Sequence, residues 1–596
     1  MLLWLNPGLA KDVRRAVKVK VAKTAGFCMG VRRAMDLALA AARERQPDEI
    51  IHTYGPLIHN TQVLRMLEER GVLCLKRVEE AEGGRLIIRA HGISPQELRE
   101  IKSRGFEVTN ATCPNVARVQ GIIKKHALEG YHVVIVGDES HAEVIGLQGF
   151  ANGRARVLST VEEVDRLPEM DKVLVVAQTT QDEQSFLDIV ERLKQRYPET
   201  QVYNTVCDST HRRQEEVRAL CREVEAMVVV GGKESANTRR LAGIAAATGI
   251  PTFHIETERE LDPEKLRGFS HVGVTAGAST PNWLIRRVVR ELDSIQPHGA
   301  PALPRVIKRF VRFLLQSSLY VAGGAGCLSF AAAVLRGGRA QALDVAVTLL
   351  YVFSMHVLNR YADKAAYYND PSRAAFYEKY RVPFFVTGVA ATGSALLLAA
   401  FQGVGVLLAL LAMTALGLLY SVRILPGQWL AVVGVGKLKD IPASKTIFVA
   451  GAWSVVAALL PGFRSGPLLD GATIYAFAVA FILVFVRSAI FDLVDVQGDR
   501  FVGKETIPIV IGEKRTRRLL SGLVLLLGAF LTAAPSLRLA TGFSYLMLPC
   551  CLYAGLCLIV YQGQRMRHDS LRFEALVESN LYLAGALAVL YKIAFV

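Results

Sequence analysis

The first 295 residues lack any apolar run long enough to cross a bilayer, and charged residues are dense throughout them. The nine cysteines follow no paired pattern, and no cleavable secretory signal is expected in the short apolar start, so a disulfide-stabilised secreted protein is not expected. Much of the formal net charge of +16 lies in loops between apolar segments. Charge placed there is typical of membrane orientation, and no nucleic-acid partner is predicted.

The composition changes near residue 300. After a Pro-rich stretch over 296–304, the chain becomes repeatedly apolar over lengths of about 17 to 25 residues, which is the span that a bilayer requires. We therefore expect a soluble α/β half joined to an all-α membrane half. The expected divisions are an N-terminal extension over 1–17, a soluble domain over 18–295, a linker over 296–308 and a membrane domain over 309–596.

Three cysteines stand in similar surroundings, each at the end of an apolar run and before a helical pattern. They are Cys28 in GFCMGV, Cys113 in NATCP and Cys207 in NTVCDST, separated by 85 and 94 residues. This recurrence predicts three similar α/β units, each of which brings one thiolate to a shared centre. Three thiolates are too few for a closed structural zinc site, but they suit a metal centre that keeps one position open for substrate.

Polar residues follow several short strand-like runs, where the carboxyl ends of parallel strands line a ligand crevice. They are His59-Asn60, Ala90-His91-Gly92, Ser140-His141-Ala142-Glu143, Gln178-Thr179-Thr180, Ser235-Ala236-Asn237 and the stretch ending at Ser279. Imidazole, hydroxyl and amide donors without an acidic cluster suit an anion such as diphosphate. Glu143 is the one carboxylate among them that is available for proton transfer.

Over residues 18–295 the chain resembles the 4-hydroxy-3-methylbut-2-enyl diphosphate reductase (IspH/LytB) family. The resemblance rests on motifs in the family's order: GFCMGV, the His59-Asn60 step, AHG, ATCP, SHAEVIG, AQTT, CDSTHRRQ, GGKESANTRRL and VTAGAST. It implies a [4Fe-4S] cluster held by Cys28, Cys113 and Cys207. It also implies a set of substrate-binding residues, namely His59, His91, His141, Thr179, Ser235, Asn237 and Ser279.

In that family, Glu143 and Thr179 would handle protons near the substrate hydroxymethyl group. The implied reaction is reductive dehydroxylation to isopentenyl and dimethylallyl diphosphates, with electrons from an external donor such as a ferredoxin or flavodoxin. One departure is visible, because Ala236 stands where the family commonly has a second serine. The loss of one hydroxyl contact is expected to change affinity and not the reaction.

The second half predicts nine membrane spans. They are expected at about 309–335, 341–358, 382–400, 403–420, 446–461, 472–491, 518–534, 543–561 and 579–596. If the soluble half is cytosolic, basic residues crowd the cytosolic loops, whereas the opposite loops offer only Arg336, Arg339, Arg464 and Arg538. The prediction is a multi-pass protein of the inner (cytoplasmic) membrane, with its N-terminal domain in the cytosol.

Two acidic motifs lie at the cytosolic ends of predicted spans. One runs from Asn359 to Asp363, and the other holds Asp492, Asp495 and Asp499. Spacings of three or four residues place each set on one helical face, and oxygen ligands from two helices suit Mg²⁺ bridging to a diphosphate. Over about 305–596 the pattern resembles the UbiA superfamily of intramembrane prenyltransferases. Arg360 and Tyr367 depart from the residues common in its first motif.

Three hypotheses remain open. The leading one joins the reductase to a membrane prenyltransferase that acts on a lipophilic acceptor. The second keeps the reductase and treats the membrane half as an inert anchor, with Arg360 and Tyr367 in its support. The third is a non-enzymatic iron-sulfur sensor on a membrane scaffold, and the intact Glu143 with its surrounding histidines argues against it.

Overall fold

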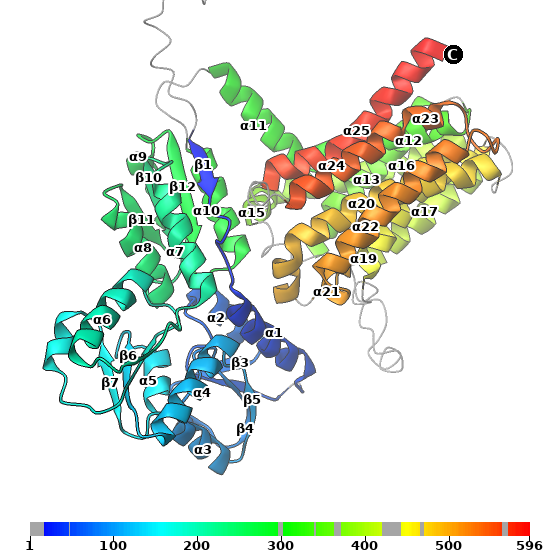
Figure 1. The fold of residues 1–596 in the computed structure, drawn as a ribbon. Helices are drawn as coiled ribbons and strands as arrows, with labels where there is room; N and C mark the ends of the chain where they lie inside the picture. Colours follow the sequence, from blue (N-terminus) through cyan, green and yellow to red (C-terminus); the bar gives the residue numbers. More distant parts are fainter. Residues whose placement is uncertain are drawn as a thin grey trace, which may run out of the picture. The chain divides into compact units, whose positions relative to one another are not determined.

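The computed structural model divides the chain into two compact units, Met1–Ala300 and Pro301–Val596 (Figure 1). The residues that it describes are 17–46, 48–295, 302–338, 341–362, 371–419, 443–464, 470–502, 504–562 and 570–595. Asp363 and Tyr367 therefore lie outside the described residues. The first unit is α/β and the second is helical, which confirms the predicted fold class of each half.

The first unit contains three parallel four-stranded sheets that share one strand order. One sheet has β2 (Ile51–Tyr54), β3 (Val72–Leu75), β4 (Gly84–Ile88) and β5 (Phe106–Asn110), and another has β6 (His132–Val136), β7 (Ala155–Leu158), β8 (Val173–Ala177) and β9 (Gln201–Tyr203). The remaining sheet has β10 (Ala226–Val230), β11 (Thr252–Ile255), β12 (His271–Ala276) and β1 (Lys18–Val21). The N-terminal strand β1 pairs with β12, so the start of the chain supplies the last strand of this sheet.

The strand orders are β3-β2-β4-β5, β7-β6-β8-β9 and β11-β10-β12-β1. In each sheet the chain crosses from the edge strand β3, β7 or β11 to the far side of the strand before it, which leaves a switch point between β2 and β4, between β6 and β8, and between β10 and β12. Open parallel sheets bind ligands at the carboxyl ends of the strands beside such a point. The helices of the unit are α1 (Met29–Glu44), α2 (Thr61–Glu68), α3 (Pro95–Ser103), α4 (Pro114–Leu128), α5 (Ala142–Gln148), α6 (Glu183–Arg196), α7 (Asp208–Cys221), α8 (Ala236–Ala247), α9 (Pro263–Leu266) and α10 (Asn282–Ser294). Three of them, α1, α4 and α7, each follow the edge strand that ends a sheet.

The sheet of β6 to β9 shows why these sequences form buried strands. Alternate residues of β6 point to opposite faces, so Val134 and Val136 pack against Phe186 of α6, whereas Val133 and Ile135 pack with Ile123 of α4. Both faces are covered, which explains why the strand reads as a continuous apolar run.

The second unit is a bundle of helices (Figure 1). They are α11 (Ala302–Gln316), α12 (Leu319–Leu335), α13 (Ala342–Ala362), α15 (Pro371–Lys379), α16 (Arg381–Gln402), α17 (Val404–Leu419), α19 (Ser444–Ser454), α20 (Gly471–Val502), α21 (Ile507–Val510), α22 (Glu513–Ala533), α23 (Phe543–Leu546), α24 (Leu548–Gln562) and α25 (Ser570–Phe595). Small residues let helices approach closely. A Cβ added at Gly585 of α25 would lie 2.7 Å from Cys327 Cβ on α12.

The structure does not confirm nine spans. Within the described residues, seven helices are long and apolar enough to cross a membrane, or eight if one bent pair counts as a span. The shorter apolar helix Val404–Leu418 covers the predicted fourth span. Several apolar helices of this length suit a multi-pass membrane protein.

The bent pair corrects the prediction of one continuous first span over 309–335. Arg309–Gln316 and Leu319–Leu335 meet at an angle of 71°. Ser318 adopts a left-handed conformation with φ of 66°, and the Ser317 hydroxyl donates to the carbonyl of Leu314. A left-handed residue cannot continue an α-helix, so the chain turns here. Helix α11 itself begins at Ala302, inside the stretch expected to be a linker.

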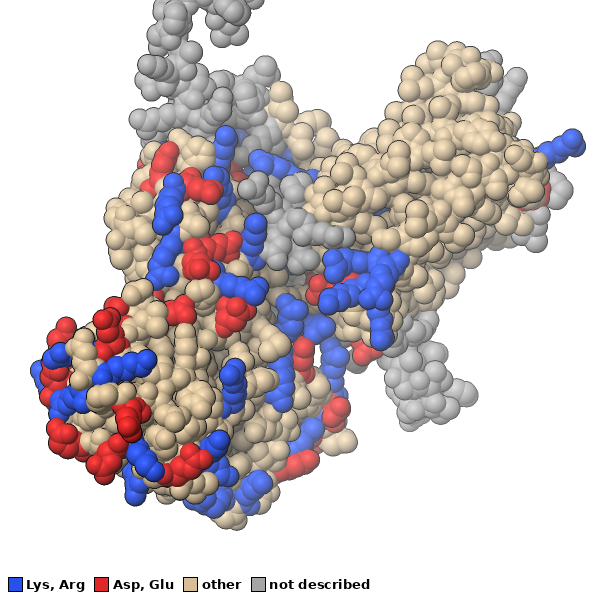
Figure 2. All heavy atoms as spheres, in the orientation of Figure 1, with Lys and Arg blue, Asp and Glu red and all other residues tan. Residues whose placement is uncertain are grey.

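Charge is distributed differently over the two units. Figure 2 shows Lys, Arg, Asp and Glu scattered over the visible face of the first unit, whereas most of the visible second unit carries none. Basic side chains gather at one end of the second unit, near α21 and the start of α22. That first turn and a half of α22 contains Lys514, Arg515, Arg517 and Arg518.

Candidate active sites

Each of the three predicted cluster cysteines occupies the same structural position. Cys28 is the N-cap of α1 after edge strand β1, Cys113 is the N-cap of α4 after β5, and Cys207 is the N-cap of α7 after β9. All three are free and half-buried. Each sheet is thus followed by a helix whose N-terminus presents one thiol.

The three thiols converge on one region. A Cβ added at Gly30 would lie 2.5 Å from Cys113 Sγ, so only glycine lets α1 approach that sulfur. Burial raises the pKa of the Cys113 thiol, and Cys28 and Cys207 lie near enough to raise it further. The Asn115 amide donates to Cys207 Sγ at 2.9 Å, which links the start of α4 to the thiol before α7.

The donor set fits an iron-sulfur cluster better than a single ion. Two thiolates on one zinc ion lie roughly 4 Å apart, because each Zn–S bond is about 2.3 Å. Among the described residues, the His, Cys, Asp and Glu ligand atoms that gather within 4.8 Å of one another belong to three histidines and not to these thiols. Three more widely spaced thiolates, each from a different sheet, suit a larger inorganic group.

A buried arginine lies beside the thiols. Arg213 of α7 donates to the carbonyls of Ala276 at 3.0 Å and Gly26 at 2.5 Å. Burial lowers the pKa of Arg213, whereas the nearby Cys28 and Cys207 act in the opposite direction. The guanidinium thus fixes the loop before Cys28 and places positive charge near two sulfurs.

The histidines predicted to bind an anion lie together. The ring centroids of His59 and His91 are 4.9 Å apart, those of His91 and His141 are 5.2 Å apart, and those of His59 and His141 are 5.9 Å apart. Each follows the first or third strand of its sheet, namely β2, β4 and β6. The three rings therefore meet at the switch points of two sheets.

Burial keeps these imidazoles neutral near pH 7. Desolvation lowers the pKa of His59, lowers that of His141 to about 4 and places that of His91 well below its usual value. His59 Nε2 and His91 Nδ1 are buried without a hydrogen-bond partner in the described structure. Buried polar atoms normally find a partner, so these two nitrogens are suited to a ligand.

Residues of the third sheet complete the histidine cluster. Ser279 Oγ donates to the carbonyl of His59 at 3.1 Å and lies 3.4 Å from Ser235 Oγ. Ser235 is the N-cap of α8 and accepts from the Thr238 backbone N–H. Asn237 Nδ2 is buried without a partner in the described part of the chain, so a further donor is available at this helix N-terminus.

Glu143 and Thr179 form a buried pair. Glu143 is 2% exposed; its Oε1 accepts from the Thr179 backbone N–H at 2.6 Å, and its Oε2 accepts from the Thr179 hydroxyl at 2.9 Å. Burial raises the pKa of Glu143 to about 7, while the bonds to Thr179 oppose the rise. A carboxyl that titrates near neutral pH can both give and take a proton.

The structure adds residues that the motif analysis left without a role. Arg89 precedes Ala90-His91 and is near enough to lower the pKa of His59, and Arg240 of α8 is near enough to act on Glu143. Both are mostly buried. Arg213 stands in the CDSTHRRQ motif and Arg240 follows SANTR, so their motifs were visible in the sequence. Their burial was not, because it depends on how the three sheets pack.

In the second unit, the three predicted carboxylates lie on the last turns of α20. Asp492 is buried; its Oδ1 accepts from Lys445 Nζ at 2.8 Å and its Oδ2 accepts from Thr446 Oγ1 at 2.5 Å. Lys445 is also near enough to Asp495 and Asp499 for their charges to interact. These residues therefore form one charged group between α19 and α20.

The other predicted motif is described only in part. Asn359 lies near the end of α13, and its Oδ1 is buried without a partner among the described residues. The ring of His356, one turn earlier, meets Trp453 of α19 edge-on. Arg487 of α20 lies over the same Trp453 ring, so α13, α19 and α20 meet around this indole.

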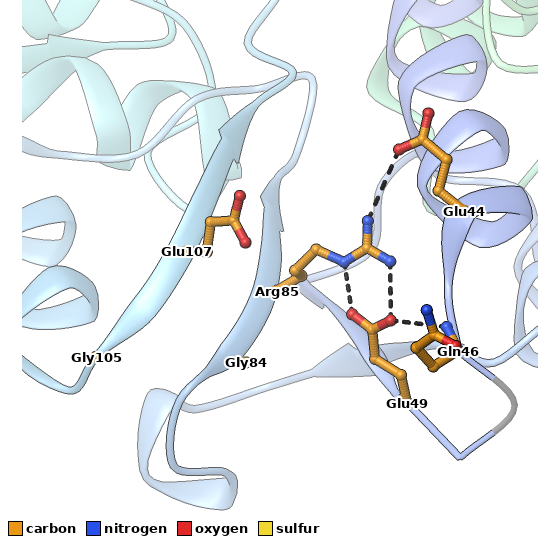
Figure 3. A pocket seen from close by; sticks show the side chains of 7 residues that line it. All are labelled: Glu44, Gln46, Glu49, Gly84, Arg85, Gly105 and Glu107. Atoms are coloured by element: carbon orange, nitrogen blue, oxygen red, sulfur yellow. Dashed lines mark hydrogen bonds and ion pairs between the residues drawn. The ribbon is translucent and has the colours of Figure 1, made fainter.

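A hollow on the first unit lies apart from these groups. Glu44, Gln46, Glu49, Gly84, Arg85, Gly105 and Glu107 line it. Figure 3 shows Arg85 turned toward Glu49 and Glu44, with its Nε 2.5 Å from Glu49 Oε1. Arginine and glutamate satisfy each other there, and no residue predicted for the site lines it.

Two family models match the chain. The model described as "LytB protein" matches residues 19–293, and the model described as "UbiA prenyltransferase family" matches residues 319–582. The 4-hydroxy-3-methylbut-2-enyl diphosphate reductase of Pelobacter propionicus is 45% identical over 279 residues, which cover 47% of this chain and 99% of that protein. The enzyme of the same name from Geobacter sulfurreducens is 45% identical over 277 residues, which cover 46% of this chain and 97% of that protein.

Solved structures match both units. The E-1-hydroxy-2-methyl-but-2-enyl-4-diphosphate reductase of Plasmodium falciparum covers 50% of this chain and 99% of its own, with 25% identity and a TM-score of 0.45. An apo UbiA homolog from Aeropyrum pernix K1 covers 46% of this chain and 98% of its own, with 15% identity and a TM-score of 0.35. The family models confirm both resemblances seen in the sequence: the chain belongs to the LytB family of 4-hydroxy-3-methylbut-2-enyl diphosphate reductases over residues 19–293 and to the UbiA prenyltransferase family over residues 319–582.

Proposed function

We propose that the first unit, over residues 18–295, reduces 4-hydroxy-3-methylbut-2-enyl diphosphate to isopentenyl and dimethylallyl diphosphates. The observation that carries this proposal is the meeting of three N-cap thiols, three neutral histidines and the buried Glu143–Thr179 pair within one fold. The reaction replaces a C–O bond by a C–H bond and releases water, so it consumes two electrons and two protons. A sensor has no need of a carboxyl poised to transfer protons, and Glu143 therefore favours the enzyme.

The residues take complementary roles in this proposal. His59, His91 and His141 bind the diphosphate together with Ser235, Asn237 and Ser279, because these side chains supply donors at the switch points. Neutral imidazoles suit that role, since each can donate one N–H without bringing a buried charge of its own.

Glu143 holds a proton at its carboxyl near neutral pH, and Thr179 orients it through the hydroxyl and the backbone N–H. Cys28, Cys113 and Cys207 would hold a [4Fe-4S] cluster, which when bound supplies electrons from a ferredoxin or flavodoxin and Lewis acidity at the substrate oxygen.

The test of the proton role is the Glu143→Gln variant of the full chain. Glutamine keeps the shape of the side chain but carries no transferable proton. Turnover is expected to fall roughly 100-fold or more, with iron content unchanged. The exposed neighbour Glu139→Gln is the matched control and should keep wild-type turnover. Wild-type turnover of Glu143→Gln would show that another group supplies the proton.

We further propose that the second unit, over 309–596, transfers a prenyl group from a diphosphate to a lipophilic acceptor with Mg²⁺. The grouping of Asp492, Asp495 and Asp499 on one end of α20 favours this function, because Mg²⁺ is bound through carboxylates and substrate phosphates. Asn359 and Asp363 complete the proposed ligand set. The unit would span the inner (cytoplasmic) membrane with the first unit in the cytosol, where an oxygen-sensitive cluster stays reduced.

The assay for transfer uses membranes that contain the full chain, a labelled long-chain prenyl diphosphate, Mg²⁺ and a panel of aromatic and glycerol-type acceptors. Asp499→Ala and Asp363→Ala are expected to abolish labelling and to leave the reductase unaffected, because the two sites share no ligands. If no acceptor is labelled and Asp363→Ala binds the diphosphate as well as wild type does, the second unit is an anchor. That result would leave the reductase proposal intact.

A further inference from the structure

Helix α11 (Ala302–Gln316) has two chemically opposite faces. Its basic residues, Arg305, Lys308, Arg309 and Arg312, follow the spacing that places them on one side of a helix. Its apolar residues include Leu303, Val306, Ile307, Phe310 and Leu314, which follow the same spacing on the other side. The helix contains no acidic residue. Four charges among fifteen residues oppose burial of this segment in hydrocarbon.

The apolar face remains uncovered. Val306, Ile307 and Phe310 are 63%, 54% and 59% exposed. Only the end of the helix is packed, where Leu315 is buried and Phe313 meets Phe376 of α15 edge-on. Arg309 and Arg312 form no ion pair with any described residue, so neither face of the helix finds its complement within the described chain.

The junction with α12 gives α11 its direction. Helix α12 has 17 residues and is roughly 25 Å long, which approaches the thickness of a bilayer core. The bend of 71° means that α11 runs within about 20° of the membrane plane if α12 stands along the normal. Arg373 donates to the carbonyl of Leu315 at 3.2 Å and so holds the elbow in place.

We propose that α11 lies in the surface of the bilayer, with its apolar face below the headgroups and its basic face toward anionic lipid phosphates. Continuity with α12 brings the helix to a membrane, and the separation of its two faces matches the two layers of the interface. Anionic lipid is the occupant that a basic helix face with Arg309 and Arg312 outside any ion pair among the described residues favours. The proposal is independent of what either unit catalyses.

The depth of the helix is tested by photocrosslinking of the full chain in vesicles of phosphatidylcholine and phosphatidylglycerol. A benzophenone amino acid replaces Phe310 in one variant and Arg309 in the matched control. Position 310 is expected to give lipid acyl-chain adducts in at least severalfold excess over position 309. Adducts from position 310 to a peptide of residues 1–295, or to a second copy of the chain, would overturn the proposal.

The role of charge is tested by hydrogen exchange of α11 amides in the same vesicles. The double variant Arg309→Gln/Arg312→Gln is expected to lose protection in α11 by about tenfold or more, with α12 and α25 unchanged. The control Arg515→Gln/Arg518→Gln removes two exposed charges from α22 and should leave α11 unchanged. Wild-type protection should also fall in pure phosphatidylcholine. Equal protection of wild type in both lipids would overturn the assignment to anionic lipid.

Discussion

Two glutamates are buried among the described residues, one in each unit, and their surroundings differ. Glu143 in the first unit is 2% exposed and accepts one hydrogen bond from the Thr179 backbone N–H and one from its hydroxyl. Glu578 of α25 is 1% exposed, and both of its oxygens accept from the guanidinium of Arg487 on α20. A buried carboxyl that no cation hydrogen-bonds keeps its proton to a higher pH, whereas two hydrogen bonds from an arginine favour an ion pair.

The same contrast extends beyond the glutamates. In the first unit, His59 Nε2, His91 Nδ1 and Asn237 Nδ2 are buried and find no hydrogen-bond partner among the residues that the structure describes. In the second unit, both oxygens of Glu574 on α25 accept from Arg373. Polar groups left open by the fold are suited to ligands, while paired groups hold helices together. The two kinds should therefore respond differently to substitution.

The largest effect is expected from the thiols, which the fold leaves open. Cys113→Ser in the full chain should lower iron from about four per chain and reduce reductase activity to background, because one of three ligands is lost. The measurement is iron content after anaerobic purification. Cys74→Ser, a half-buried thiol of β3, is the matched control and should keep both iron and activity. Full iron content in Cys113→Ser would contradict the assignment of the cluster site.

The next largest effect is expected on the stability of the second unit, when the ion pair between Arg487 and Glu578 is broken. Arg487→Met leaves Glu578 buried without its cation, which should cost about 3 to 5 kcal/mol in unfolding free energy of the second unit. The double variant Arg487→Met/Glu578→Leu should recover most of that loss, because the uncompensated charge is gone. Denaturant titration in detergent measures both. Equal stability of Arg487→Met and wild type would show that the ion pair between Arg487 and Glu578 does not stabilise the second unit.

The pH dependence of stability distinguishes the two glutamates further. Burial raises the folded pKa of Glu143 from 4.5 to about 7, so the folded state binds more protons between these values. The free energy of unfolding of the first unit should therefore fall as pH rises from about 4.5 through 7, by about 1 to 3 kcal/mol relative to Glu143→Gln. Pulse proteolysis of both proteins across this range measures the difference. A difference that does not change with pH would mean that Glu143 titrates normally.

The smallest effect concerns one absent hydroxyl. Ala236 is buried in the first turn of α8, between Ser235 and Asn237. Ala236→Ser should lower KM for the diphosphate by less than about tenfold and leave kcat unchanged, since one neutral hydrogen bond contributes about 1 kcal/mol. Ala247→Ser at the other end of α8 is a control without access to the site. A change in kcat for Ala236→Ser would show that this position affects a step after substrate binding.

The sequence by itself determined the two fold classes, the two families and the recurrence of Cys28, Cys113 and Cys207. Local patterns suffice for these features, because the spacing of apolar residues, the turn residues and the motifs can all be read directly along the sequence. The sequence also suggested the polar residues after each strand. It did not determine that β1 closes the last sheet, because strand pairing over more than 200 residues leaves no local trace.

Only the tertiary structure decided which polar groups are open and which are paired. The motif around Glu143 predicted a role in proton transfer, but neither its contact with Thr179 nor the contact of Glu578 with Arg487 on a distant helix could be read from the sequence. The bend at Ser318 was also not predicted, because the three polar residues 316–318 are too few to interrupt an apolar stretch that resumes at Leu319. Burial and pairing depend on packing between segments far apart in the chain. The pKa of Glu143 and the direction of α11 follow from that packing, so they could not be predicted from the sequence.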